Sequence, residues 1–156
     1  MSQRTSRSKD NILEPSSLCQ IGIVVKNINE TIDYYTKAFG FGPYEIKYVD
    51  YTDATYYGET AGYRGKRAFF HLGNIEMELI ELVDGKTIHE DFLEEHGEGI
   101  HHIGFKVNNL AESRKNAENA GFKITQDFMR SDGTGFAYLD TDKTGGVVFE
   151  LIKYQL

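Results

Sequence analysis

The sequence lacks the features that mark secreted, membrane-spanning and nucleic-acid-binding proteins. A single cysteine, Cys19, excludes a disulfide within the chain and fits a reducing, cytoplasmic setting. No run of 18 apolar residues occurs, so neither a membrane span nor a membrane partner is expected. The net charge of −7 argues against a nucleic-acid partner, which would need a basic stripe.

What remains is the composition of a small globular protein. The 156 residues are 40% apolar and 26% charged, enough for one ordinary domain or for two half-size modules that share a core. Residues 1–17 are polar and slightly basic and have no apolar core. We therefore predict a disordered tail there, and neither a signal peptide nor a membrane anchor.

The rest of the chain is an internal duplication. A strand pattern that begins at Gln20 recurs at His102, an offset of 82 residues. Across the last hairpin of each copy the offset grows from 67 to 72, because the turn in the second copy is longer. The matched pairs include Gln20 with His102, Gly22 with Gly104, Asn27 with Asn109, and Glu78 with Glu150.

Each copy has the pattern of a β-α-β-β-β module. Apolar alternation predicts the strands, and Asn27 or Asn29 with Gly40 predicts the ends of the first helix. Thr87-Ile88-His89-Glu90 has the form of a capping box, which predicts a linker helix. The expected organisation is a first module at 18–83, a linker helix at 84–98 and a second module at 99–156, in an α+β fold whose curved sheet encloses a cleft.

Strand alternation makes four polar residues a candidate site. Gln20 and His102 lie opposite the apolar face of the first strand in each copy, and Glu78 and Glu150 do so in the last strand. If each module curls its sheet away from its helix, pairing the modules brings all four side chains into one cleft. An amide oxygen, an imidazole nitrogen and two carboxylates form a ligand set for a divalent metal, because the carboxylates neutralise its charge. Three oxygens and one nitrogen favour Mn, Co, Ni, Fe, or Zn with bound waters.

Three segments carry a resemblance to a known family. They are Gln20-Ile-Gly-Ile-Val-Val, Gly99-Ile-His-His-Ile-Gly-Phe-Lys-Val and Gly146-Val-Val-Phe-Glu-Leu-Ile. From about Leu18 to Tyr154 the chain resembles the vicinal oxygen chelate superfamily, which contains the glyoxalases, bleomycin-resistance proteins and dioxygenases. It looks most like methylmalonyl-CoA epimerase and glyoxalase-type proteins. The resemblance implies paired β-α-β-β-β modules, a homodimer, and metal ligands at the positions of the four polar residues.

The resemblance also implies catalytic roles. It places the base for a 1,2-proton shift at Glu150. Strict epimerisation needs a second acid or base in the middle of the first module, where Glu59 is the available glutamate, although a loop charge is an equally good interpretation. Gln20 departs from the epimerases, which usually have histidine there, and matches the Gln, Glu, His and Glu ligands of eukaryotic-type glyoxalase I.

Other polar residues have plainer interpretations. His101 has the opposite strand parity from His102 and is expected in packing or behind the ligands, and Glu76 is expected at the rim or as a second acid. Arg64, Lys66 and Arg67 form the densest basic cluster, which is either a coenzyme A phosphate site or a solvated strand end.

Three functions follow as hypotheses. The first is a metal-dependent isomerase or epimerase acting beside a thioester or ketone carbonyl, with an acyl-CoA or another carbonyl compound as substrate. The second is a glyoxalase I-like lyase acting on a glutathione adduct. The third is a metal-free binder of a small molecule such as an antibiotic. A dioxygenase is disfavoured because iron-dependent oxygen chemistry usually uses two histidines and one carboxylate, and one of the four positions is histidine.

Overall fold

The computed structural model describes residues 11–13 and 17–155 and contains three helices and one mixed sheet within this part of the chain. The helices are α1 (Ile28–Phe39), α2 (Ile88–His96) and α3 (Leu110–Asn119). The strands are β1 (Leu18–Val24), β2 (Glu45–Tyr51), β3 (Thr55–Tyr56), β4 (Glu59–Thr60), β5 (Tyr63–Leu72), β6 (Ile75–Gly85), β7 (Gly99–Lys106), β8 (Ile124–Met129), β9 (Gly135–Leu139) and β10 (Val148–Lys153).

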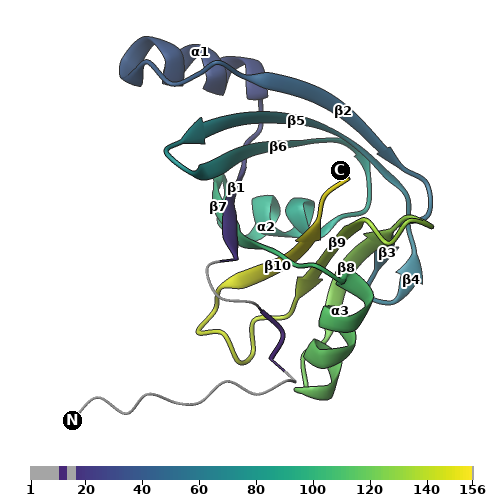
Figure 1. Cartoon of the computed structure of the whole chain (residues 1–156). Helices are drawn as coiled ribbons and strands as arrows, with labels where there is room; N and C mark the ends of the chain where they lie inside the picture. Colours follow the sequence, from purple (N-terminus) through teal and green to yellow (C-terminus); the bar gives the residue numbers. More distant parts are fainter. Residues whose placement is uncertain (1–10, 14–16, 156) are drawn as a thin grey trace.

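The sheet joins the two copies of the repeat into one curled layer (Figure 1). Its strand order is β2-β5-β6-β1-β7-β10-β9-β8-β3-β4. The first module contributes one half and the second module the other, and they meet where β1 and β7 pair antiparallel. This confirms the predicted α+β fold with tandem β-α-β-β-β modules. It also shows that the modules pair within one chain.

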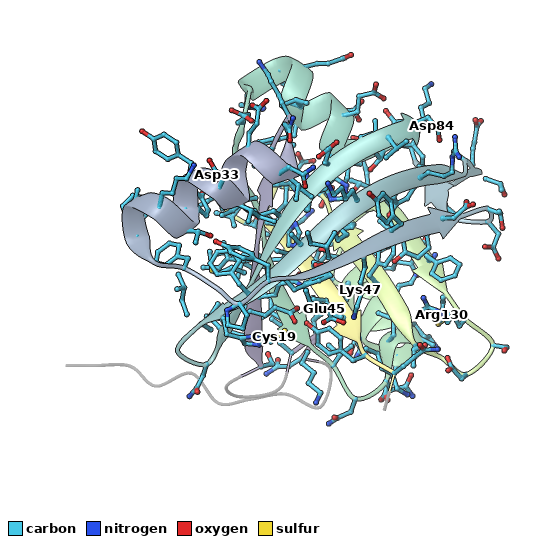
Figure 2. The ribbon with its side chains drawn as sticks, turned by 90° about the horizontal axis from the view of Figure 1, so that it is seen from above. Cys19, Asp33, Glu45, Lys47, Asp84 and Arg130 are labelled. Atoms are coloured by element: carbon cyan, nitrogen blue, oxygen red, sulfur yellow. The ribbon has the colours of Figure 1, made fainter. Side chains whose placement is uncertain are left out.

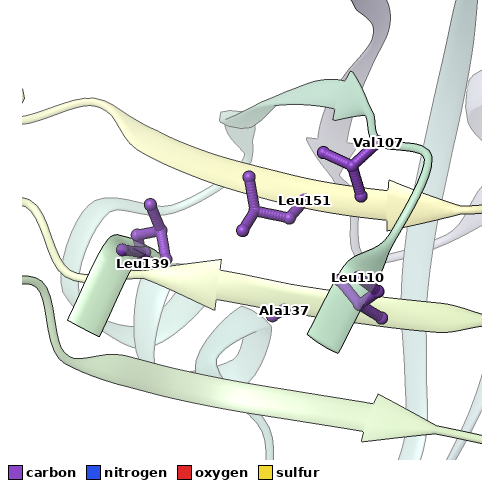
Figure 3. Packing of buried hydrophobic residues seen from close by; sticks show 6 residues of the cluster. Val107, Leu110, Ala137, Leu139 and Leu151 are labelled. Atoms are coloured by element: carbon purple, nitrogen blue, oxygen red, sulfur yellow. The ribbon is translucent and has the colours of Figure 1, made fainter. Parts of the chain in front are cut away.

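A helix covers the outer face of each half of the sheet. The Asn27 side chain caps α1, and Gly40 ends it in the left-handed conformation that glycine favours. The inner side of α1 packs on an apolar cluster that includes Ile28, Phe70 and Leu79. A matching cluster lies under α3 and consists of Val107, Leu110, Ala117, Ala137, Leu139 and Leu151. Figure 3 shows how its labelled members pack together. The apolar residues of each strand are thus used against the helices, which leaves the opposite face for polar groups.

A segment of the first half completes the second half. The region 50–66 was expected to be a loop followed by a strand, and the structure adds the two-residue strands β3 and β4, with β3 pairing with β8. Just before β3, the Tyr51 ring packs against Phe128 and Phe136, at centroid distances of 4.8 and 5.4 Å. Aromatic contacts therefore join the two halves across the inner face of the curled sheet.

Two residues of the expected tail are packed. Ile12 and Leu13 are partly buried against the cluster under α3. They therefore belong to the packed structure rather than to a loose tail, whereas residues 1–10 and 14–16 lie outside the described residues. Among the described residues, no helix has the length and apolar character needed to cross a bilayer.

Candidate metal centre

Gly22 provides the space in which the His102 ring lies. In the sheet, Gly22 of β1 lies opposite Glu78 of β6 on one side and opposite His102 of β7 on the other. Residues directly opposite each other on neighbouring strands project from the same face. A Cβ atom on Gly22 would overlap three atoms of the His102 imidazole. The missing side chain therefore allows the ring to lie over β1, on the same face as Glu78.

Gly104 does the same for Gln20. It lies opposite Gln20 of β1 on one side and opposite Glu150 of β10 on the other. A Cβ atom on Gly104 would lie 2.9 Å from the Cβ of Gln20, closer than real contacts allow. Because Gly104 is the repeat equivalent of Gly22, the duplication has preserved both a polar residue and the glycine that makes room for the opposite one.

The four predicted residues meet at one atom, the Nε2 of His102. Glu150 Oε2 lies 2.9 Å from it, Gln20 Oε1 lies 3.1 Å from it, and Glu78 Oε2 lies 3.5 Å from it. All four residues are buried, with between 0 and 8% of their surface exposed. The structure therefore brings together side chains that are up to 130 positions apart in the sequence, Gln20 and Glu150.

This donor set fits a divalent cation. An imidazole nitrogen carries at most one proton, so Nε2 cannot donate a hydrogen bond to three oxygens. Glu150 Oε2 is fully buried and makes no hydrogen bond, because no N–H is aligned with it despite its short distance from Nε2. Glu78, His102 and Glu150 each offer one ligand atom, and these atoms lie within 4.8 Å of one another. Two buried carboxylates facing one another are costly unless a cation compensates them.

Glu76 fixes the orientation of the Gln20 amide. Gln20 Nε2 donates a hydrogen bond of 2.8 Å to Glu76 Oε1, which also accepts one of 3.3 Å from the Tyr154 hydroxyl. A carboxylate accepts and does not donate, so the amide nitrogen must face Glu76 and the amide oxygen must face His102. Of the two roles expected for Glu76, its partly buried position fits the rim, where it holds a candidate ligand in place.

His101 contacts His102 because β7 contains a bulge. The pairing of β1 with β7 runs from Gly22–His102 directly to Ile23–Ile100, which leaves His101 as the extra residue. A bulge redirects a side chain that strict alternation would send to the other face. The two Nδ1 atoms lie 3.0 Å apart. When His102 donates its Nδ1 proton to His101, its Nε2 keeps the lone pair that a metal requires.

Burial and the two carboxylates shift the pKa values of this cluster. Burial, together with the charge of Glu150, raises the pKa of Glu78 to about 7, although Arg67 opposes the shift. Burial alone would lower the pKa of His102, but the negative charges of Glu150 and Glu78 outweigh it and raise the pKa. Burial, with His102 and Arg67, lowers the pKa of His101 to about 3, so His101 is neutral near pH 7 and can accept the proton from His102.

His89 lies buried behind the pair of histidines. Thr87 Oγ1 donates to Gln126 Oε1 at 2.8 Å, so His89 Nδ1, 2.9 Å from the same hydroxyl, must be the donor to it. The His89 Nε2 is buried without a hydrogen-bond partner, and its ring packs against His101 at a centroid distance of 4.6 Å. The capping-box sequence predicted the start of α2 but gave no sign that Thr87 also ties the helix to β8.

Glu59 is not brought to the cluster. It lies on β4, is exposed, and is paired across the strands with Tyr56. Four strand spacings of roughly 4.8 Å separate it from Glu150 along the sheet, about 19 Å in all. In the described part of the chain, no hydrogen bond or ion pair joins Glu59 to the four clustered residues.

The three basic residues of β5 do not form one patch. Arg64 is exposed and pairs with Asp84 near the end of β6 (Figure 2), whereas Lys66 is buried and donates to Asn29 Oδ1 at 2.7 Å. Arg67 is buried on the inner face, with its Nε 3.4 Å from Glu78 Oε1. Strand alternation and the bulge near Gly65 point the three side chains in different directions. The three residues therefore form neither the expected phosphate site nor the expected solvated strand end, and each makes a contact of its own.

A cavity adjoins the cluster on the side of α2. It has a volume of about 820 Å³ and is lined by residues of α2, β7 and the turn before β10. His101 and His102 form part of its wall, and apolar side chains such as Phe92 and Val148 form another part. Its size is typical of a pocket for a small organic ligand.

Comparisons with known proteins agree with this architecture. A curated relative, the uncharacterized protein YqjC of Bacillus subtilis (strain 168), is 28% identical over 138 residues, which cover 87% of this chain and 91% of the relative. A methylmalonyl-CoA epimerase structure from Mycobacterium tuberculosis has a TM-score of 0.67 at 17% identity, covering 97% of this chain and 94% of that one. A variant of the Streptomyces coelicolor methylmalonyl-CoA epimerase, in complex with 2-nitronate-propionyl-CoA, has a TM-score of 0.68 at 19% identity, covering 90% and 98%.

At these identities the structural matches establish the fold. The family follows from the sequence itself, because a family model matches residues 19–138, most of the chain. The duplicated modules, the curled sheet and this match agree with the resemblance drawn from the strand motifs. The chain belongs to the glyoxalase/bleomycin resistance protein/dioxygenase superfamily.

Proposed function

We propose that this protein is a metal-dependent isomerase or lyase that moves a proton at a carbon next to a metal-bound carbonyl. Gln20, Glu78, His102 and Glu150 would hold the metal. The observation that carries the proposal is the convergence of three side-chain oxygens, two from carboxylates, on one buried imidazole nitrogen. When bound, a divalent ion would polarise the carbonyl oxygen and stabilise the negative charge left by proton loss.

The residues of the chain supply the proton chemistry. We assign the base to Glu150, whose Oε2 is buried beside His102 Nε2 without a hydrogen bond of its own. A carboxylate oxygen that no hydrogen-bond donor occupies is available to accept a proton from a bound substrate. Glu76 holds the Gln20 amide, and His101 holds the His102 ring. By keeping these two ligands rigid, both contacts would position the substrate indirectly.

Epimerisation also needs a proton carrier on the second face of the carbon. Glu78 is the second carboxylate of the cluster, and its pKa of about 7 suits an acid or base that works at neutral pH. We therefore prefer Glu78 to the more distant Glu59 for this role. With Glu150 and Glu78 on either side of His102, epimerisation and a one-base proton shift both remain compatible with the site.

The related structures guide the choice of substrates. Those of methylmalonyl-CoA epimerase include one in complex with methylmalonyl-CoA and NH4+, at 20% identity and a TM-score of 0.65. Acyl-CoA thioesters are accordingly the first compounds to test. We further infer a homodimer, as the family resemblance implies, and a divalent ion such as Co, Ni, Mn, Zn or Fe.

A glyoxalase I-like lyase is the second candidate. Its support is the ligand set itself, since Gln20 stands where the epimerases usually have a histidine, and the set of Gln, Glu, His and Glu matches eukaryotic-type glyoxalase I. Turnover of the hemithioacetal of methylglyoxal and glutathione would select this activity. If the protein remains metal-free and binds its ligand without turnover, it is instead a metal-free binder of a small molecule.

The test is solvent deuterium exchange, followed by mass spectrometry, into a panel of acyl-CoA and 2-oxo compounds with and without added metal. We expect metal-dependent exchange into at least one compound, and its loss in Glu150→Gln. Glu59→Gln is the matched control and should retain exchange. Undiminished exchange in Glu150→Gln would remove Glu150 from the role of base.

A further inference from the structure

Arg67 is a buried cation beside the candidate metal centre, and the proton chemistry above gives it no role. Only 5% of its surface is exposed, and its Nε lies 3.4 Å from Glu78 Oε1. The other oxygen of Glu78 faces His102. Charged side chains are rarely buried so completely unless they pair with something, and arginine stays protonated in proteins. Arg67 therefore brings a permanent positive charge to the inner face of the sheet.

The backbone of β5 is shaped to hold this guanidinium. Its Nη1 donates to the carbonyl oxygens of Lys66 and Glu81, at 3.2 and 3.5 Å. A Cβ atom on Gly65 would lie 2.6 Å from Nη1, so glycine at this position makes the arrangement possible. These hydrogen bonds use the Nη1 protons, and Nε lies on the side of the ion pair with Glu78. Among the described residues, no hydrogen bond engages Nη2, which has two N–H groups to offer.

The charges of the site leave room for one anion. Glu78 and Glu150 contribute two negative charges, Arg67 contributes one positive charge, and a bound divalent ion would contribute two more. The total of plus one, in a buried site, is compensated by a ligand that carries one negative charge. Glu76 lies at the partly exposed rim, where it is hydrogen-bonded to the Gln20 amide and is screened by solvent.

We propose that Arg67 binds a carboxylate of the substrate beside the carbon that exchanges its proton. The substrates would then be carbonyl compounds that carry a carboxylate close to the carbonyl, such as 2-oxo acids or malonyl-type thioesters. A planar guanidinium with unused N–H groups is well suited to a carboxylate. This inference rests on the proposed function and narrows it, because a neutral carbonyl compound would leave the positive charge of the site uncompensated.

The test compares an acid with its uncharged ester on the metal-loaded protein. Calorimetry would give the dissociation constants of pyruvate and methyl pyruvate, and of malonate and dimethyl malonate. We expect the acids to bind at least tenfold more tightly than the esters. Arg67→Gln should weaken binding of the acids by about ten- to hundredfold, as expected for the loss of one charge-assisted hydrogen bond, with little change for the esters. Arg67→Lys should restore part of the loss.

The control is Arg64→Gln, which removes an exposed arginine of the same strand and should leave all four constants unchanged. Equal binding of acids and esters by the wild type, or equal binding of acids by wild type and Arg67→Gln, would overturn the inference. If Arg67→Gln does not fold, the dissociation constants of acids and esters are compared between the wild type and Arg67→Lys, and these constants test the inference. Metal is measured first, so a protein that takes up no metal contradicts the proposed function, whereas metal uptake without acid selectivity contradicts this inference alone.

Discussion

The imidazole of His102 lies where the side chain of residue 22 would be, and Gly22 is the reason that it can. The two residues are opposite each other on β1 and β7, and a Cβ atom on Gly22 would overlap the ring. The repeat places Gly104 in the equivalent position, opposite Gln20. The pairing of the two modules along β1 and β7 therefore builds the centre of the site.

Replacing Gly22 with alanine should disrupt this centre. The added methyl group must displace the His102 ring, so we expect metal affinity to fall by more than tenfold and the free energy of unfolding to fall by about 1–3 kcal/mol. Metal titration and urea unfolding measure the two effects. Gly99→Ala is the control, because the nearest atom to its Cβ would be 3.9 Å away. Normal metal affinity in Gly22→Ala would contradict the role assigned to the glycine.

Removing Glu76 should weaken metal binding without removing a ligand. Glu76→Ala leaves the Gln20 amide free to turn, and the loss of such an orienting hydrogen bond typically costs about ten- to hundredfold in metal affinity. Glu76→Gln, whose amide oxygen can still accept from Gln20, should recover part of the affinity. If Glu76→Ala binds metal as tightly as the wild type, the Gln20 amide does not depend on Glu76.

Metal affinity should depend on pH near neutrality. Glu78 and His102 must both be unprotonated to bind a metal, and the pKa of each is raised in the folded protein, that of Glu78 to about 7. Affinity should be full at pH 8 and fall progressively as the pH drops through 7, rather than through the range near 4 where ordinary carboxylates titrate. Calorimetric titrations at pH 8, 7 and 6 test this, and an affinity that is constant down to pH 5 would contradict it.

The hydrogen bond from Tyr56 to Asp91 should stabilise the contact between β3 and α2. The hydroxyl donates to Asp91 Oδ2 at 2.8 Å, and this bond raises the pKa of Tyr56 to about 12. A raised pKa means that the neutral phenol is favoured in the folded state, so the contribution is full below pH 10 and lost as the pH rises through 12. Tyr56→Phe should lower the free energy of unfolding at pH 7 by about 1 kcal/mol.

Urea unfolding at pH 7 and pH 11 measures this contribution, and the difference between wild type and Tyr56→Phe should be smaller at the higher pH. Tyr57→Phe is the control, because the Tyr57 side chain is largely exposed. A Tyr56→Phe variant as stable as the wild type at pH 7 would show that the hydrogen bond contributes nothing measurable.

The repeat in the sequence predicted the module order, because each copy contains the same alternation and the same helix ends. Strand alternation also predicted which face Gln20, Glu78, His102 and Glu150 share, since one face of each strand had to pack on a helix. The structure then showed how they meet: the pairing of β1 with β7 is a contact between modules, and neither copy alone determines it.

Features that depend on tertiary structure were not predictable. Strict alternation would send the His101 side chain to the opposite face of the sheet, but the bulge redirects it toward His102. No residue in this segment indicates a bulge. The pairing of β3 with β8 places Glu59 on an exposed strand, and so removes it from the cluster. Arg67 was grouped with its basic neighbours because the sequence does not reveal which of them turns inward beside Glu78.

The stoichiometry of metal binding decides whether the four clustered residues form a metal centre. The purified protein would be stripped with chelator, titrated separately with Co, Ni, Mn, Zn and Fe(II), the last under anaerobic conditions, and compared with a folded Glu78→Gln/Glu150→Gln double variant. We expect one tightly bound ion per wild-type chain for at least one of these metals, and none in the double variant. Failure of the wild type to bind any of them, or an unchanged stoichiometry in the double variant, would contradict this expectation.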